Sequence, residues 1–279
     1  MTLFQPGRVA KWAALGVVFC AFLSLYERNV YAEDDLRDVA NRGAEVQDDA
    51  TSASSSQASR TENEEKEEDA FDYATLFDEP ETLKKLDKKA PIWITKDRKF
   101  IALGGVLCLR DGPLEFFACR RNSKEHESIF SLDIPPHLIH ASLLAIGARQ
   151  GAPAKYDPEF VPPSGETIEI EARWRDEKTR ELRKVRAQEL VLENESNKTM
   201  SSHWVFTGGL FSVDPDGKKY YLANVTGEVF GVSNFPGSVL DVPFESSSDN
   251  NSLCYSANAR ALPPVGTKVL LVLSRKNPK

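Results

Sequence analysis

The residues with the most potential for chemistry lie in one short polar segment, residues 124–128 with the sequence KEHES, which closely follows a cysteine. An ammonium, two carboxylates, an imidazole and a thiol are groups that bind metal ions or anions and transfer protons. In an extended chain the two carboxylates would face away from the imidazole, so a shared ligand requires that the chain turns here. The segment predicts a binding site made of Cys119, Lys124, Glu125, His126 and Glu127.

Three histidines, His126, His140 and His203, are weaker candidates for metal ligation, because imidazole nitrogen suits zinc, copper and iron. The spacing matches no zinc signature, since the sequence has no CxxC, HxxxH or HExxH motif. His137 and His140 are three positions apart at the start of an expected helix. We favour the interpretation that His137 caps this helix and His140 packs at its edge. The sequence specifies no cofactor.

Nucleophilic chemistry is the alternative for the same segment. A histidine near a cysteine lowers the thiol pKa, so Cys119 with His126 would make a thiol-dependent enzyme. Ser238 and Asp241 offer a second, hydrolase-like set, but the sequence lacks the GxSxG motif. The simpler interpretation of Cys119 is a small buried strand residue. A third possibility is a structural envelope component in which the polar segment is only a hydrogen-bonded turn.

The first 32 residues have the three zones of an export signal. Arg8 and Lys11 precede a fifteen-residue apolar run at 12–26, and Val30-Tyr31-Ala32 is a small-x-small cleavage site. The run is shorter than the roughly 20 residues that span a bilayer. We therefore expect a cleaved signal peptide at 1–32, a secreted or periplasmic protein and no integral membrane span after cleavage.

An exported chain can keep disulfides, and three cysteines follow the signal: Cys108, Cys119 and Cys254. An odd number leaves at least one free thiol. Cys108 and Cys119 flank an Arg-Asp-Gly-Pro turn at 110–113, across which they could pair, but the sequence does not fix the register that a disulfide requires. The pairing therefore stays open.

The acidity of the chain is concentrated in one segment. The whole chain carries a net charge of −7, whereas residues 33–90 hold eighteen acidic and eight basic residues. Residues 33–69 have too little apolar area to offset the entropy of ordering, so we expect an acidic disordered tether. A short helical lead-in is expected at 70–89 and one globular domain at 90–279. The chain has no basic excess, so no nucleic-acid partner is expected, and other partners are not specified.

The globular domain has mostly strand signals. Residues 168–175 alternate apolar and charged residues, which is typical of a half-buried strand. Pro215 and Gly217 indicate a hairpin turn at 214–217. One helix with a broad apolar face is expected at 135–148. We predict an α+β, strand-rich fold with a mostly antiparallel sandwich or open barrel and one main buried helix. The strands are expected at 100–109, 114–119, 128–133, 168–175, 184–192, 204–213, 219–223, 228–233, 253–259 and 268–274.

Several segments together resemble the YdjY-like domain family over roughly residues 90–274. The most specific are KEHES at 124–128, WVFTG at 204–208 and NFP at 234–236, in this order, supported by GPLE at 112–115 and PPVGT at 263–267. The family is functionally uncharacterised, and some members join this domain to a ferredoxin-type iron–sulfur segment. This chain has no CxxCxxC run and cannot hold a four-cysteine cluster by itself, which argues against a redox role. We expect an exported, non-enzymatic binding domain for a metal ion or a small anion.

Overall fold

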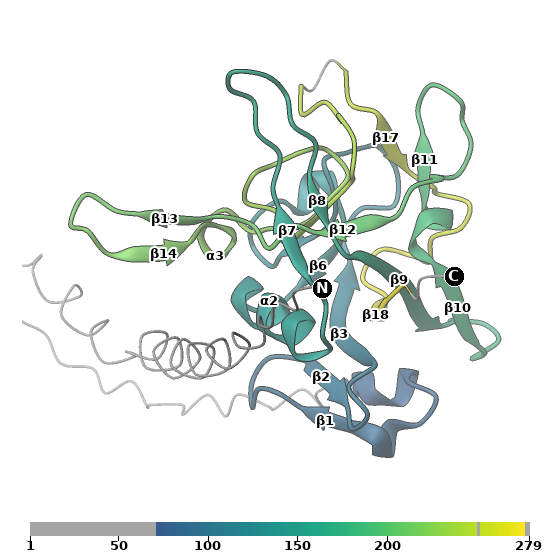
Figure 1. The fold of residues 1–279 in the computed structure, drawn as a ribbon. Coiled ribbons are helices and arrows are strands. Elements are labelled where there is room, and N and C mark those ends of the chain that lie inside the picture. Colours follow the sequence, from purple (N-terminus) through teal and green to yellow (C-terminus); the bar gives the residue numbers. More distant parts are fainter. Residues whose placement is uncertain (1–70, 250–251, 277–279) are drawn as a thin grey trace, which may run out of the picture. The chain divides into compact units, whose positions relative to one another are not determined.

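The structure is a computed structural model, and it describes residues 71–249 and 252–276 (Figure 1). The signal peptide predicted at 1–32 and the acidic tether predicted at 33–69 lie outside these residues. Within the described ranges, no helix combines the length and the apolar character that crossing a bilayer requires.

A closed barrel forms the centre of the described chain. Eight strands follow one another around it in the order β3-β18-β9-β12-β16-β15-β5-β6, and β6 pairs with β3 to close the ring. The pairs β15–β16 and β5–β6 are parallel and the others are antiparallel. The strands are β3 (Phe100–Leu107), β5 (Phe116–Arg120), β6 (Ser128–Leu132), β9 (Thr167–Arg175), β12 (Trp204–Phe206), β15 (Glu228–Gly231), β16 (Leu240–Asp241) and β18 (Lys268–Arg275).

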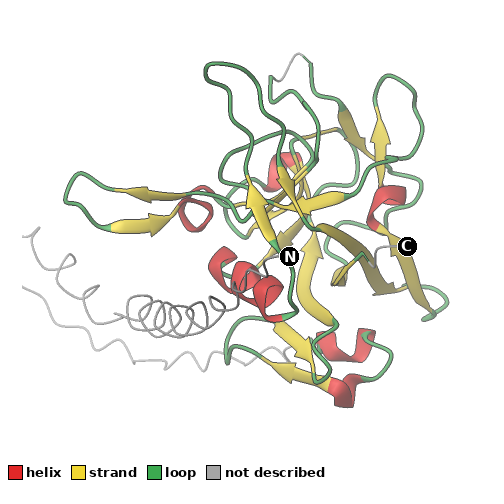
Figure 2. Ribbon diagram, in the orientation of Figure 1, coloured by secondary structure: helices red, strands yellow, loops and turns green. Residues whose placement is uncertain are grey.

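This architecture corrects the expected fold class in two respects. The molecule is strand-rich and its sheets are mostly antiparallel, as expected. It is, however, mostly β with few helices (Figure 2) where an α+β fold was expected, and the barrel is closed and contains two parallel pairs where a sandwich or open barrel was expected. Closure depends on the pairing of β3 with β6, whose partners are far apart in sequence, such as Val106 and Ser131. A pairing of this kind leaves no local pattern in the sequence.

Other strands extend or flank the barrel. The strands β1 and β2 continue the sheet beyond β3, and β10 pairs with β9. The strands β11, β17 and β4 form a three-stranded sheet, β7 pairs with β8, and β13 and β14 form a two-stranded ribbon that projects from the barrel (Figure 1). Their bounds are β1 (Leu83–Lys85), β2 (Ile92–Thr95), β4 (Pro113–Leu114), β7 (Gln150–Ala152), β8 (Ser164–Gly165), β10 (Leu182–Arg186), β11 (Val191–Glu193), β13 (Phe211–Val213), β14 (Lys219–Tyr221) and β17 (Tyr255–Ala257).

The longest helix in the described residues is α2 (Pro136–Ala145), at the position predicted for the main buried helix. It begins at a proline, which is favoured in the first turn. Gly147 ends it in the left-handed region with φ 81°, and the backbone of Ala148 donates to Leu143 O at 3.0 Å, as in a Schellman motif. The other helical segments are α3 (Leu222–Thr226) and the 3₁₀ turns η1 (Tyr73–Leu76), η2 (Pro80–Thr82), η3 (Glu125–Glu127) and η4 (Ala187–Leu190).

Two expected strands are interrupted for identifiable reasons. The strand expected at 204–213 breaks at Gly208 and Gly209, which have φ of 83° and 62°, outside the β region. The strand expected at 184–192 is interrupted by η4, so it becomes β10 and β11. The hairpin predicted around 214–217 is present and joins β13 to β14. The alternation predicted for 168–175 is realised in β9, where Ile168, Ile170 and Ala172 are buried.

A second, smaller apolar cluster lies apart from the main core. It combines Leu76 of η1 with Trp93 of β2, Ala102 of β3, and Leu270 and Val272 of β18. The segment predicted as a helical lead-in at 70–89 thus consists, from residue 71 onward, of two 3₁₀ turns and β1, and it packs on barrel strands. Because Leu76 is buried against these strands, the segment is part of the folded unit.

Candidate functional site

The KEHES segment forms a turn between two parallel strands. β5 ends at Arg120, β6 begins at Ser128, and residues 121–127 carry the chain back so that both strands run in the same direction. Residues 125–127 of this connection are the 3₁₀ turn η3. The chain therefore turns where a shared site requires it, but the five predicted side chains lie in four different environments.

Lys124 and Glu127 belong to the first environment, an acidic cluster under the turn. Lys124 Nζ lies 2.9 Å from Glu127 Oε1 and 3.8 Å from Glu115 Oε2. The ammonium also sits 5.2 Å from the ring centroid of Phe116 and 5.5 Å from that of Phe235. Segments that carry the family resemblance, GPLE, KEHES and NFP, therefore meet around one lysine.

Carboxyl groups outnumber the ammonium in this cluster. Burial, with the neighbouring charge of Glu127 and a hydrogen bond to it, raises the pKa of Glu115 to about 7. Two carboxyls can hydrogen-bond to each other only when they share a proton. Burial also raises the pKa of Glu228, although Lys124 opposes this shift. The cluster therefore presents three carboxyl groups to one lysine.

Two of these acids were missed by sequence reasoning. Glu115 lies between Leu114 and Phe116, and Glu228 directly precedes Val229; both are almost fully buried. In the sequence, each of these acids is a single charged residue within or beside an apolar run. An acidic residue is rarely buried without a partner, so its position in such a run was the available signal.

Cys119 belongs to the second environment, a thiol pair. Its side chain has no exposed surface and interacts with the partly buried thiol of Cys108. Hydrogen bonds from Cys108 and then Ser128 and the Lys124 backbone lower the pKa of Cys119, although burial opposes them. The same thiol contact, followed by burial, raises the pKa of Cys108, whose Sγ also donates to Ser128 O at 3.1 Å.

The three described cysteines are free thiols. Cys108 follows β3 and Cys119 lies on β5, on opposite sides of β6, where the Cys108 backbone donates to Ile129 O and Cys119 pairs with Ser131. Their backbones are separated by two interstrand spacings of about 4.8 Å each. The total separation exceeds the ~7 Å between Cα atoms that a disulfide tolerates. The pair therefore meets through its side chains rather than across a hairpin.

The last two predicted site residues, Glu125 and His126, lie in different surroundings from each other. Hydrogen bonds from the backbones of Asn122 and Ser123 and from Ser131 lower the pKa of Glu125, although burial opposes them. The His126 side chain is 77% exposed, and its Nε2 lies 3.5 Å from Glu127 Oε2. Cys119 and His126 are thus a buried thiol and a solvent-facing imidazole, which does not favour a nucleophile–base pair.

The remaining histidines have hydrogen-bond partners that are not acids or thiols. His140 Nδ1 lies 3.1 Å from Gly208 O, and burial lowers the pKa of this imidazole. His203 Nδ1 lies 3.1 Å from Gln188 Nε2, and its Nε2 lies 2.9 Å from Lys276 Nζ. Across the part of the chain that the structure describes, no group of three or more His, Cys, Asp or Glu side chains is placed to hold a metal ion.

The start of α2 differs from the expected capping. The backbone N–H of His137 donates to Asn224 Oδ1 at 3.1 Å, and the His137 ring contacts the same amide. Asn224 of α3 therefore caps this helix. His140 packs as expected, and its ring centroid lies 5.3 Å from that of Phe206.

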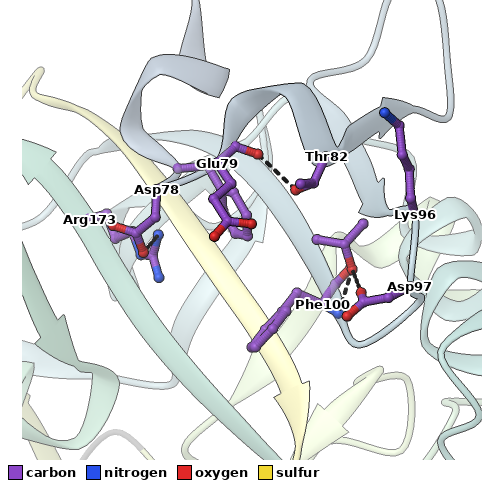
Figure 3. A pocket seen from close by; sticks show the side chains of 9 residues that line it. Asp78, Glu79, Thr82, Lys96, Asp97, Phe100 and Arg173 are labelled. Atoms are coloured by element: carbon purple, nitrogen blue, oxygen red, sulfur yellow. Dashed lines mark hydrogen bonds and ion pairs between the residues drawn. The ribbon is translucent and has the colours of Figure 1, made fainter.

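A surface pocket of about 330 Å³ lies between the lead-in and the outer face of the barrel (Figure 3). Three of its charged groups have partners: Arg173 Nη1 lies 3.1 Å from Asp78 Oδ2, and Thr95 Oγ1 donates to Asp97 Oδ1 at 2.7 Å. The Arg173 guanidinium also lies 5.0 Å from the Phe77 ring centroid. The pocket contains none of the residues predicted for the site, although Glu79 and Lys96 also line it.

Comparison with known proteins gives one result. The family model of the YdjY domain matches residues 92–274, more than half of the chain. No curated protein and no solved structure matches the chain.

Proposed function

The chain belongs to the YdjY domain family, and on this premise we propose that it is an exported binding domain for a soft metal ion, with the thiols of Cys108 and Cys119 as ligands. The observation that carries the proposal is that both thiols lie at Ser128 of β6: Cys108 Sγ donates to Ser128 O at 3.1 Å, and Cys108 and Ser128 both lower the pKa of Cys119. Thiolate sulfur selects soft ions such as Cu(I). The partly exposed Cys108 gives an entering ion access to the buried Cys119.

The acidic cluster argues against a small anion as ligand. Lys124 already has Glu127 Oε1 at 2.9 Å and Glu115 Oε2 at 3.8 Å, so its charge is engaged. An anion approaching this lysine would meet the negative field of both acids and of Glu228. The ligand of this region is therefore a cation.

The donor set also discriminates among metal ions. Structural zinc takes four ligands and calcium takes six to eight oxygens, and the described residues offer no group of three acidic, histidine or cysteine side chains for either. A monovalent soft ion needs only two sulfur ligands. Metal binding releases thiol protons, and the hydrogen bonds that lower the pKa of Cys119 favour its thiolate.

Anaerobic competition for Cu(I) against a chromogenic chelator tests the proposal. We expect one ion per chain, and we expect Cys108→Ser and Cys119→Ser each to abolish tight binding. Cys254→Ser is the matched control, because this partly buried thiol donates to the Ser252 carbonyl and packs against the main apolar core. Undiminished binding by the Cys108→Ser, Cys119→Ser double variant would show that the ion binds elsewhere.

A histidine variant separates this proposal from ligation by the KEHES imidazole. His126→Ala is expected to bind Cu(I) as the wild type does, because its ring is exposed and contacts Glu127. A loss of affinity in this variant, with wild-type stability, would make His126 a ligand and the two-thiol site incomplete.

A further inference from the structure

Three buried oxygen atoms near the NFP segment have no hydrogen-bond partner in the described residues. They are Ser233 Oγ, Ser238 Oγ and Asp241 Oδ2, and none of the three side chains has exposed surface. An unpaired buried hydroxyl is costly and an unpaired carboxylate more so, and three such atoms in one region therefore point to a binding site.

Atoms of the same three residues, among them the unpaired Ser238 Oγ, surround the place that a side chain at Gly231 would occupy. A methyl group at Gly231 would lie 2.7 Å from Ser233 O, 3.1 Å from Ser238 Oγ and 3.2 Å from Asp241 Oδ1. All three neighbours are oxygens, and glycine is the residue that leaves room among them. A carbonyl and a carboxylate can only accept, so this lining is suited to a cation or to a donating water.

The electrostatics favour a positive ligand. The groups that hydrogen-bond to Asp241 are neutral: the backbone of Val242 donates to Oδ1 at 2.7 Å, Asn234 Nδ2 donates to Oδ1 at 3.1 Å, and the backbone of Phe235 also interacts with this carboxyl. Glu228 adds a second negative charge nearby, and burial raises the pKa of Asp241 to about 8. A buried carboxylate without a cationic partner is strongly disfavoured.

A surrounding hydrogen-bond network holds this region in place. Ser246 donates from its backbone to Asn234 Oδ1 at 2.7 Å and from its hydroxyl to Val232 O at 2.6 Å. Trp204 Nε1 donates to Gly231 O at 2.7 Å. The oxygens are therefore fixed before a ligand arrives, which reduces the entropic cost of binding.

We propose that Asp241, Ser233 and Ser238 form a buried binding site for a dehydrated monovalent cation such as sodium. One carboxylate balances a single positive charge, and the neutral oxygens of the two serines replace its hydration shell. A divalent ion would require more carboxylates or retained water. The site is independent of the two thiols proposed above, because it uses hard oxygen ligands and a different ion.

Thermal unfolding of the full chain in sodium chloride, against choline chloride at equal ionic strength, tests the proposal. We expect sodium to raise the Tm by several degrees and the rise to saturate with sodium concentration, because the ion binds only the folded state. Asp241→Asn is expected to lose the sodium-specific rise, and the control Asp216→Asn, at an exposed turn position, is expected to keep it.

Ser238→Ala provides a second variant if Asp241→Asn does not fold. It removes one neutral ligand and is expected to raise the sodium concentration at half-saturation by about tenfold, the factor that corresponds to 1.4 kcal/mol. Equal wild-type Tm values in the two salts would show that the oxygens bind only water. A sodium-specific rise that persists in Asp241→Asn would also overturn the proposal.

Discussion

At the scale of single residues, the raised pKa of Glu115 makes stability depend on pH. The pKa of Glu115 is raised from 4.5 to about 7 in the folded protein. The folded state therefore retains a proton that the unfolded chain releases, and this contribution to stability is fully present below pH 4.5 and is lost as the pH rises through 7. The slope for one proton is at most about 1.4 kcal/mol per pH unit.

Glu115→Gln is expected to reduce this decline, because glutamine has no proton to lose. Urea unfolding between about pH 5 and 8 measures the effect as the slope of the free energy of unfolding against pH. In choline chloride, where no sodium occupies the proposed site, part of the slope remains, since burial raises the pKa of Asp241 to about 8. The surface variant Glu189→Gln, which removes the ion pair with Arg186, is the control. An unchanged slope in Glu115→Gln would show that Glu115 is ionised throughout.

The residues of this cluster were only partly predictable from the sequence. Lys124 and Glu127 were predicted from a run of adjacent polar residues, and both lie in the acidic cluster. Glu115 and Glu228 come from separate strands and reach the same lysine only because of the barrel topology. The direction of each side chain also depends on the turn at η3. The alternation of side chains along an extended strand does not predict this turn.

At the scale of secondary-structure elements, local signals predicted α2 and β9 well and failed where glycine or a short turn intervened. The proline start and glycine end of α2 are visible in the sequence, as is the alternation in β9. The strand break at Gly208 and Gly209 depends on a positive φ, which glycine permits but does not require.

The lead-in element is expected to contribute to the stability of the barrel. Leu76 of η1 is fully buried against an apolar cluster that includes Leu270 and Val272 of β18. Leu76→Ala removes this packing and is expected to lower the free energy of unfolding by about 2–5 kcal/mol. Leu86→Ala, at a side chain that is 41% exposed, is the control and is expected to have a much smaller effect. Equal effects in urea unfolding would mean that η1 does not pack on the barrel in solution.

At the scale of the whole molecule, closure of the barrel determines whether the two thiols meet. Cys108 directly follows β3, Cys119 lies on β5, and β6 lies between them. The thiols are neighbours only while β3 pairs with β6. This pairing joins segments more than twenty residues apart, such as Leu107 and Phe130. No local pattern encodes it, so neither the closed barrel nor the approach of the two thiols across β6 was predictable from spacing alone.

Gly105 lies at this closure and provides its test. A methyl group there would lie 2.6 Å from Leu132 Cδ2 and 3.0 Å from Ser131 O, both on β6. Gly105→Ala therefore overpacks the β3–β6 contact, and we expect a loss of about 1–3 kcal/mol in stability. Hydrogen exchange should show faster exchange of the Cys108 amide, which donates to Ile129 O in the native fold.

The neighbouring Gly104 offers the matched control, because its added methyl group would meet Tyr73 and Pro91 instead of β6. Both variants are expected to lose stability through overpacking, but only Gly105→Ala should also weaken Cu(I) binding, since it separates the strands that bring the two thiols together. Equal affinities in the two variants, together with faster exchange at Cys108 in Gly105→Ala alone, would mean that the thiols bind the ion without a closed barrel. The site would then depend on the 121–127 turn and not on the β3–β6 pairing.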